Sequence, residues 1–185
     1  MNVYFRRIAL LLMTLAGMSL SAEQFTIFPD RKELRSPDGQ YVVRSVEHMA
    51  ESGEFTGVFR TLVVEEVARG RVRKLYDYVG RVAVAWSGSD FIIVTDYVNK
   101  KTSRALVFPV PPNRDGLIVD KTQLIPLLPE EQHVHLEQND HVFVEASSVE
   151  GRVLNLRVWG YGRRDASGFR FNCRYDLILG TAACQ

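Results

Sequence analysis

Cysteine is scarce in this chain of 185 residues, which has only Cys173 and Cys184. The two are not spaced as a Cys-x-x-Cys pair, so a reactive or metal-binding thiol pair is not indicated. The sequence also lacks a Gly-x-Ser-x-Gly elbow, a phosphate-binding glycine loop and a catalytic-cysteine pattern. With these signatures missing, we expect a protein that is not an enzyme.

The chain has no excess of charge of either sign. It has 23 basic and 22 acidic residues, and removal of the first 22 residues takes away two arginines, leaving 21 against 22. A protein that binds nucleic acid or an anionic membrane surface normally carries a clustered cationic face. The densest basic run, residues 69–74, is more typical of the solvated face of a strand beside a turn. We therefore expect no nucleic-acid partner.

Only one long hydrophobic run is present, Ile8–Ala22, directly behind Arg6 and Arg7 and ending at Glu23. About fifteen residues rise only about 22 Å as a helix, less than the roughly 30 Å of a bilayer core. The basic start, short apolar stretch and small residues before Glu23 are typical of a secretory signal peptide, residues 1–22, with cleavage after Ala22 or Ser21. We expect a periplasmic or secreted protein exported by the general route, with no stable membrane insertion after cleavage.

The two cysteines lie eleven positions apart near the C-terminus. In an oxidising compartment such a pair tends to form a disulfide. A Cys173–Cys184 bond would hold the C-terminal tail against the last strand and contribute about 3 kcal/mol in the chain-entropy model. We predict this disulfide, with a structural role.

Short β-branched and aromatic runs separated by turn residues dominate the chain after Gln40, which predicts an all-β protein. One short helix is expected within Lys121–Glu131. The predicted strands are Gln40–Val46, Phe59–Val67, Arg71–Tyr78, Val82–Trp86, Phe91–Tyr97, Ala105–Val110, His141–Ser147, Val153–Trp159 and Phe169–Ile178.

A weak internal repeat places a polar turn before an apolar strand three times, at residues 36–43, 86–94 and 148–154. The complete turn is Ser36-Pro37-Asp38-Gly39, and the last unit ends in a strand and the glycine turn 176–180. With these motifs the chain resembles the blades of TolB-like and WD40-like β-propellers. The resemblance implies three blade-like units, at about 34–79, 80–127 and 140–180, within one domain spanning 23–185.

Three units are fewer than the four to eight blades with which propellers usually close. We therefore expect antiparallel blade-like sheets that bury their faces on each other, as a partial β-propeller or a sandwich-like stack, or that pair with another chain. Trp86 and Trp159 are predicted to lie between sheets. The alternative, an exposed tryptophan that binds a sugar, remains open.

Three of the four histidines cluster in the segment 130–141. If this segment is extended, His133 and His135 share one face, and with His141, Glu137 or Asp140 they resemble a zinc or copper site. The alternative is a polar edge or loop that enters the strand beginning at His141.

Other polar and aromatic residues are assigned structural roles. Asp77, Asp90 and Asp96 are expected in or near turns, where aspartate usually bonds its own backbone. The aromatic residues Tyr76, Tyr78, Phe91 and Tyr97 are interpreted as cross-strand packing pairs, with a recognition surface as the alternative. The longer polar loops are the places to look for a partner site; they are 50–56, 109–116 and 163–168.

Three functions are consistent with these features. The leading hypothesis is an exported, non-enzymatic β protein that binds another protein of the cell envelope, for which an inhibitor or immunity partner of an envelope-acting enzyme is one specific form. The second is a small metal-binding protein or metalloenzyme that uses His133, His135 and His141. The third is a structural envelope component that self-assembles as a homo-oligomer.

Overall fold

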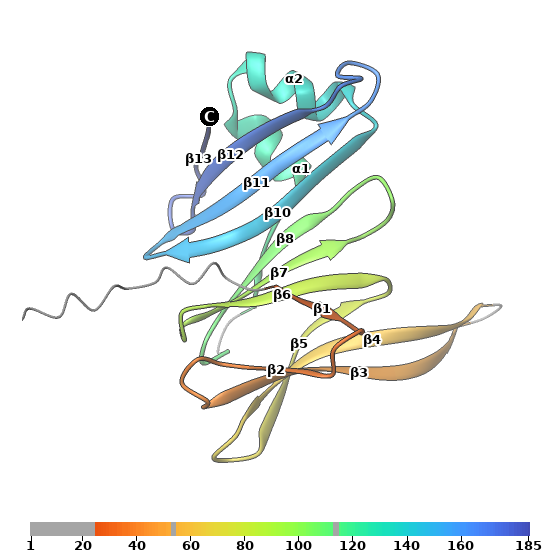
Figure 1. The fold of residues 1–185 in the computed structure, drawn as a ribbon, viewed down its shortest axis with the longest axis vertical. Coiled ribbons are helices and arrows are strands. Elements are labelled where there is room, and N and C mark those ends of the chain that lie inside the picture. Colours follow the sequence, from red (N-terminus) through yellow and green to blue (C-terminus); the bar gives the residue numbers. More distant parts are fainter. Residues whose placement is uncertain (1–24, 53–54, 113–114) are drawn as a thin grey trace, which may run out of the picture.

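The computed structural model describes residues 25–52, 55–112 and 115–185. Its framework is three antiparallel sheets that follow one another along the chain, with two short helices near the C-terminal sheet (Figure 1). The predicted signal peptide, residues 1–22, lies outside the described residues. Within the described ranges, none of the helices has the length and apolar character needed to cross a membrane.

The three sheets are named here by their order in the chain. The N-terminal sheet has the order β2-β3-β4-β5, with β2 at Glu33–Arg35, β3 at Tyr41–Ser52, β4 at Phe55–Glu66 and β5 at Arg71–Tyr78. The central sheet has the order β1-β6-β7-β8-β9, with β1 at Thr26–Phe28, β6 at Arg81–Ser87, β7 at Phe91–Tyr97, β8 at Arg104–Pro109 and β9 at Leu117–Val119. The C-terminal sheet has the order β10-β11-β12-β13, with β10 at His141–Glu150, β11 at Val153–Tyr161, β12 at Phe169–Asp176 and β13 at Ala182–Cys184.

The central sheet is buried on both faces, which is why β6, β7 and β8 are almost continuously apolar. Alternate side chains of these strands enter two separate cores. The larger ones, among them Trp86, Ile92 and Phe108, pack against the N-terminal sheet. Smaller side chains, among them Ala85 and Ala105, lie on the other face and pack against the C-terminal sheet. The predicted antiparallel all-β stack is confirmed, and no closed propeller is formed by the described residues.

Small side chains on the central sheet allow β10 to approach closely and bond to it. The hydroxyl of Thr95 accepts a hydrogen bond from the Ala146 amide (3.1 Å), and that of Ser103 donates to the Val144 carbonyl (3.0 Å). Ser87 likewise bonds both backbone groups of Val149. Because β10 is the edge of its sheet, these contacts satisfy backbone groups that would otherwise invite pairing with another chain. The edge next to the central sheet is therefore closed.

The polar turns of the repeat have a clear conformational cause. In the first, the Asp38 carboxylate accepts hydrogen bonds from the Ser36 hydroxyl (2.6 Å) and the Gln40 amide (3.0 Å), and Gly39 has φ of 72°. In the last, Asp176 accepts from the amides of Ile178 and Leu179 before a glycine. These bonds hold the pKa of both carboxyls below its usual value. Aspartate followed by a left-handed glycine is the chemistry that such turns require.

The helical segment is longer than predicted. It consists of α1 at Lys121–Leu124, a 3₁₀ turn at Ile125–Leu127 and α2 at Glu130–Gln138. Asp120 caps α1 through the amides of Thr122 and Gln123. Leu124, Leu128 and Leu136 are buried in the core shared with the C-terminal sheet. The helices thus cover the part of that sheet's inner face that the central sheet does not reach.

The predicted disulfide is present. Cys173 on β12 and Cys184 on β13 are register partners and are bonded to each other. The strand bounds agree with prediction for β5 and β7, whereas the β3–β4 hairpin is longer than expected. Four strands of three residues each, β1, β2, β9 and β13, were not predicted, because such short segments carry too little alternation to be recognised.

Candidate functional site

The three histidines of the predicted metal site lie on two different elements. His133 and His135 belong to α2, while His141 begins β10. Residues two positions apart on a helix lie roughly 200° apart around its axis, so these imidazoles do not share a face. The shared face depended on an extended segment, and this condition is not met because residues 130–138 are helical. In the ranges that the structure describes, no three histidine, cysteine or carboxylate side chains come together as a metal site requires.

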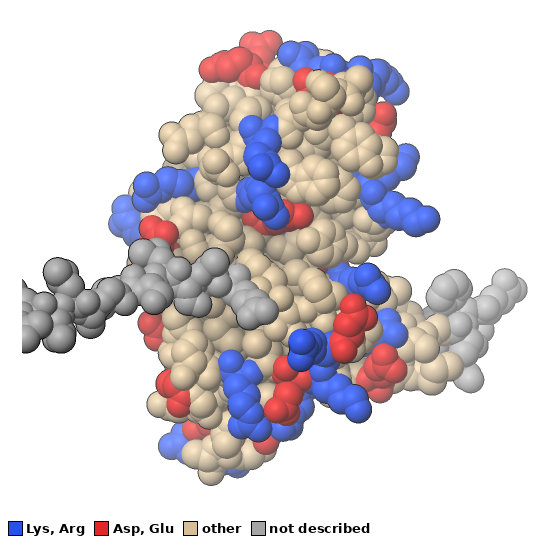
Figure 2. All heavy atoms as spheres, viewed as in Figure 1, with Lys and Arg blue, Asp and Glu red and all other residues tan. Residues whose placement is uncertain are grey.

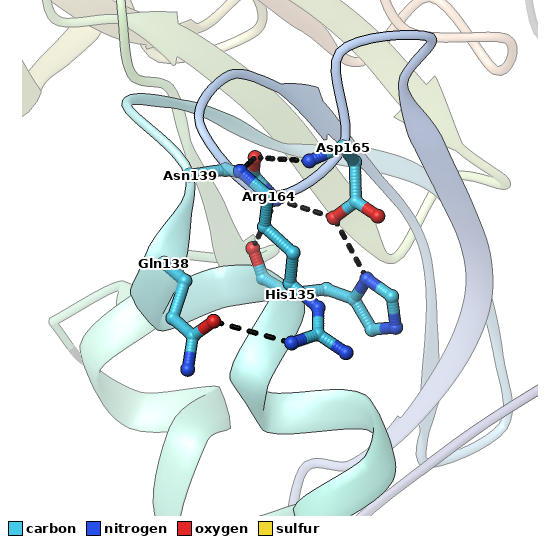
Figure 3. Close-up of polar contacts among 5 residues, drawn as sticks. All are labelled: His135, Gln138, Asn139, Arg164 and Asp165. Atoms are coloured by element: carbon cyan, nitrogen blue, oxygen red, sulfur yellow. Dashed lines mark hydrogen bonds and ion pairs between the residues drawn. The ribbon is translucent and has the colours of Figure 1, made fainter.

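His135 instead belongs to a polar cluster that joins the C-terminal end of α2 to the loop between β11 and β12 (Figure 3). Its Nδ1 lies 2.8 Å from the Asp165 carboxylate, and its ring packs on Phe169 and Phe171. The buried Asn139 side chain donates to Asp165 and to the His135 carbonyl, and accepts from the amides of Arg164 and Asp165. The cluster therefore fixes the loop rather than forming a reactive centre.

Asp165 makes this anchor sensitive to acid. Burial alone would raise the pKa of its carboxyl, but hydrogen bonds from His135 and Asn139 outweigh burial and hold the pKa below its usual value. Because the folded-state pKa is depressed, the contribution of Asp165 to stability is present above the unfolded value of about 3.9 and is lost as pH falls through the folded value.

We expect Asp165→Asn to lower the free energy of unfolding by about 1–2 kcal/mol at pH 6, because one ionised acceptor of the cluster is lost. The difference from the wild type should shrink as the pH falls from about 4 through the depressed folded-state pKa of Asp165, because the carboxyl is protonated first in the unfolded chain and then in the folded one. Urea unfolding between pH 3 and pH 7 measures this. Asp140→Asn, at an exposed neighbouring position, is the control. A wild-type minus Asp165→Asn difference that stays constant with pH would contradict the assignment.

The loop held by this cluster borders the outer face of the C-terminal sheet, defined here as the side that faces away from the core. Leu154, Leu156 and Val158 of β11 point into the core, so Trp159 points the other way. The prediction that Trp159 lies between sheets is therefore wrong, because side chains alternate along a strand. Trp86, by contrast, lies in the core between the N-terminal and central sheets, 7% exposed.

Two aromatic pairs lie side by side on the outer face. Strand register places His141 opposite Tyr161 and Phe143 opposite Trp159. Both pairs are stacked, each with ring centroids 4.3 Å apart. Tyr161 is 42% exposed, and Phe143 is buried. The two pairs form an ordered aromatic surface, because each ring is stacked on its cross-strand neighbour.

Arginine surrounds this aromatic surface. Arg170 is the register partner of Trp159 on β12, Arg174 lies further along the same strand, and Arg163 begins the bordering loop. None of these three forms an ion pair with another described residue, whereas Arg157 is bonded to the buried carboxylate of Glu145 (2.8 Å). Figure 2 shows blue side chains spread across the part of the surface formed by β10–β12. The exposed part of this face is therefore aromatic and cationic.

The aspartates expected in turns differ in their positions. Asp90 lies in the turn after β6, as predicted, and Asp77 lies in β5, where it bonds Thr61 and Lys74. Asp96 is the penultimate residue of β7, near the turn that follows, and is 4% exposed; the expectation that it bonds its own backbone is wrong, because it bonds Tyr76 and Arg104 instead.

The buried carboxylate of Asp96 accepts hydrogen bonds from the Tyr76 hydroxyl (2.5 Å) and from Nε of Arg104 (3.1 Å). Burial and the neighbouring carboxylate raise the pKa of Tyr76. The three side chains come from the N-terminal and central sheets and are bonded to one another. This arrangement connects the two sheets.

Comparison with protein-family models, curated proteins and solved structures found no match. The candidate site is therefore assigned from the geometry of its own residues. Sequence reasoning named the 163–168 loop as a place for a partner site, and that loop does border the outer face. It missed the aromatic surface, although the alternation of Leu154, Leu156 and Val158 already placed Trp159 on the opposite side.

Proposed function

We propose that this chain is an exported, non-enzymatic protein-binding module that engages a partner in the cell envelope through the outer face of its C-terminal sheet. The observation that carries the proposal is the aromatic surface of Tyr161 and Trp159, flanked by arginines that form no ion pair within the described part of the chain. Tyrosine, tryptophan and arginine are the residue types that dominate binding energy in protein interfaces. The exported location is inferred from residues 1–22.

The arrangement of the sheet supports binding to another protein. The inner face is used by the central sheet and the helices, so the outer face is the one left for a partner. The rings are already stacked, and the bordering loop is anchored by the His135–Asp165 contact. A surface that is ordered before binding loses little conformational freedom when it binds.

The positive charge of the outer face indicates which kind of partner surface would be complementary to it. Arg163, Arg170 and Arg174 have no carboxylate partner among the described residues, and Glu145 is already bonded to Arg157. A partner that presents acidic residues around an apolar patch would complement this surface, and association should be faster at low ionic strength. We therefore propose an acidic protein surface as the target.

We also propose that the three sheets are blade-like units related to those of TolB-like and WD40-like propellers. The strand triplets β3–β5, β6–β8 and β10–β12 fall within the repeat ranges 34–79, 80–127 and 140–180. The turns before the repeated strands each contain a glycine at positive φ, namely Gly39, Gly88 and Gly151. Propeller blades commonly serve as interaction scaffolds, which agrees with a binding role by analogy.

We expect Arg170→Glu with Tyr161→Ala to weaken partner binding by about 30-fold or more, the effect typical of losing interface hot spots. Affinity capture from an envelope extract, followed by mass spectrometry, would identify proteins retained by the wild type, and titration with the purified partner would give the affinity. Binding by the wild type should also weaken as salt is raised from 50 to 300 mM.

Arg31→Glu provides the matched control for this experiment. Arg31 lies in the exposed turn after β1, on a different sheet, and its replacement makes the same change of charge as Arg170→Glu. This variant should keep the partner. Capture of the same proteins by all variants, or of no recurrent protein by the wild type, would contradict the proposal.

A further inference from the structure

Three arginines enter a second region, between the N-terminal sheet and the loop that follows β8. Arg71 and Arg73 of β5 are the register partners of Glu66 and Val64, and Arg69 lies in the preceding turn. With Tyr41, Pro111 and Pro112, these residues line a hollow of about 280 Å³, called here the arginine cleft. It lies near the β4–β5 hairpin, at the lower end of the molecule in Figure 1.

The charges in the arginine cleft are not balanced by the protein. Arg69 is paired with Glu66 (2.8 Å), which among the described residues is the only carboxylate that lines the cleft. Arg71 and Arg73 form no ion pair with any described residue, although Arg44, Arg60 and Lys74 on the same sheet are all paired. Glu66, the cross-strand partner of Arg71, is bonded to Arg69 and forms no ion pair with Arg71. Two unpaired guanidinium groups therefore favour a bound counter-anion.

One wall of the cleft is held in place by an arginine. The Arg73 guanidinium donates a hydrogen bond to the carbonyl of Pro112, which connects β5 to the loop after β8. Beyond this bridge lies a second hollow lined by Lys74, Asp115 and Phe108. Tyr41, Val64, Pro111 and Pro112 give the cleft an apolar wall beside its cationic one. The apolar wall can contact the compact carbon skeleton of a small ligand. Guanidinium groups bind carboxylate or phosphate groups through two parallel hydrogen bonds.

We propose that the arginine cleft is a binding site for a small organic anion that carries two or more negative charges as carboxylate or phosphate groups. Arg71 supplies the principal contact, because it has no other partner among the described residues. Arg73 supplies a second contact while it keeps its bond to Pro112. This site is separate from the outer face of the C-terminal sheet and does not depend on the proposed protein-binding function.

Isothermal titration of the purified mature protein with citrate and with inorganic phosphate tests this site. We expect saturable binding in the micromolar to low-millimolar range, stronger for citrate because it can also contact the apolar wall. Backbone amide shifts in an NMR titration should concentrate at 69–73 and at the end of β8. Arg71→Glu should weaken binding at least about tenfold, the loss expected for a charge-assisted hydrogen bond.

Two variants and one further probe complete the test. Arg31→Glu makes the same charge change outside the cleft and should bind like the wild type. Arg71→Lys keeps the charge but loses the planar fork, so intermediate binding is expected. Vesicles containing anionic phosphatidylglycerol give a separate arm, and preference for them over citrate would overturn the assignment to a small free anion. Absence of saturable citrate binding at 10 mM, or equal binding by Arg71→Glu, would overturn the site itself.

Discussion

Replacement of Arg104 by alanine should lower the free energy of unfolding by about 2–4 kcal/mol, because it leaves the buried Asp96 carboxylate without its cation. Asp96 is 4% exposed, and Arg104 contacts both Asp96 and the Tyr76 hydroxyl. The Arg104 side chain is 33% exposed, so water partly compensates the loss and the estimate stays below that for a fully buried pair. Urea unfolding at pH 7 measures the change.

Two comparisons separate this effect from a general loss of charge. Arg44→Ala removes a pair with Glu65 on a more exposed surface and should cost less than about 1 kcal/mol. The double variant Asp96→Leu with Arg104→Met replaces both the buried carboxylate and its cation by apolar side chains. It should recover most of the stability lost in Arg104→Ala. Equal losses in Arg104→Ala and Arg44→Ala would show that the Asp96 carboxylate is solvated.

The Asp96 network also bears on whether this carboxylate is a catalytic group. Its Oδ2 accepts from both Tyr76 and Arg104, which belong to different sheets, and the ring of Tyr76 also lies 5.4 Å from the Arg104 guanidinium. A general acid or base needs access to a substrate proton, whereas these three groups contact one another. The contacts among Tyr76, Asp96 and Arg104 therefore connect the N-terminal and central sheets at a polar position within an otherwise apolar interface.

Much of the fold was readable from the sequence because its signals are local. The runs 82–86 and 105–110 are continuously apolar and the run 91–94 is too, which is typical of strands covered on both faces, and these runs form the core of the central sheet. The cysteine spacing led directly to the observed disulfide. The helix α2 was missed because its polar residues resembled a loop. Pro129 followed by Glu130 and Glu131 is nevertheless a helix-start signal that favours this assignment.

The candidate site was less predictable because it depends on which distant segments meet. Alternation along β11 was enough to place Trp159 outside the core, but its stacking on Phe143 follows from the β10–β11 register. The contact between His135 and Asp165 joins residues 30 positions apart. The arginine cleft likewise exists only because Pro111 and Pro112 lie against β5. Sequence patterns give the face on which a side chain lies, whereas its partners require the tertiary arrangement.

Replacement of Trp86 by alanine should have the largest effect on stability, about 3–5 kcal/mol. Trp86 is 7% exposed and packs between the N-terminal and central sheets, where its Nε1 donates to the Leu34 carbonyl at 3.4 Å. Removing the indole leaves a cavity between two layers that cannot collapse independently, because the central sheet is also packed on its other side. Denaturant unfolding followed by far-ultraviolet circular dichroism measures the loss.

The chain offers a matched control, since Trp159 is its only other tryptophan. Trp159→Ala removes the same side chain from the outer face of the C-terminal sheet, where one side of the ring faces Phe143 and none of the described sheets covers it. We expect it to cost about half as much as Trp86→Ala or less, because mainly the stacking contact is lost. It should instead weaken partner binding, which Trp86→Ala should leave unchanged for the folded fraction. Similar stability losses for both variants would mean that Trp159 is covered in solution by another surface, and sedimentation of the wild type would then show whether that surface belongs to a second copy of the chain.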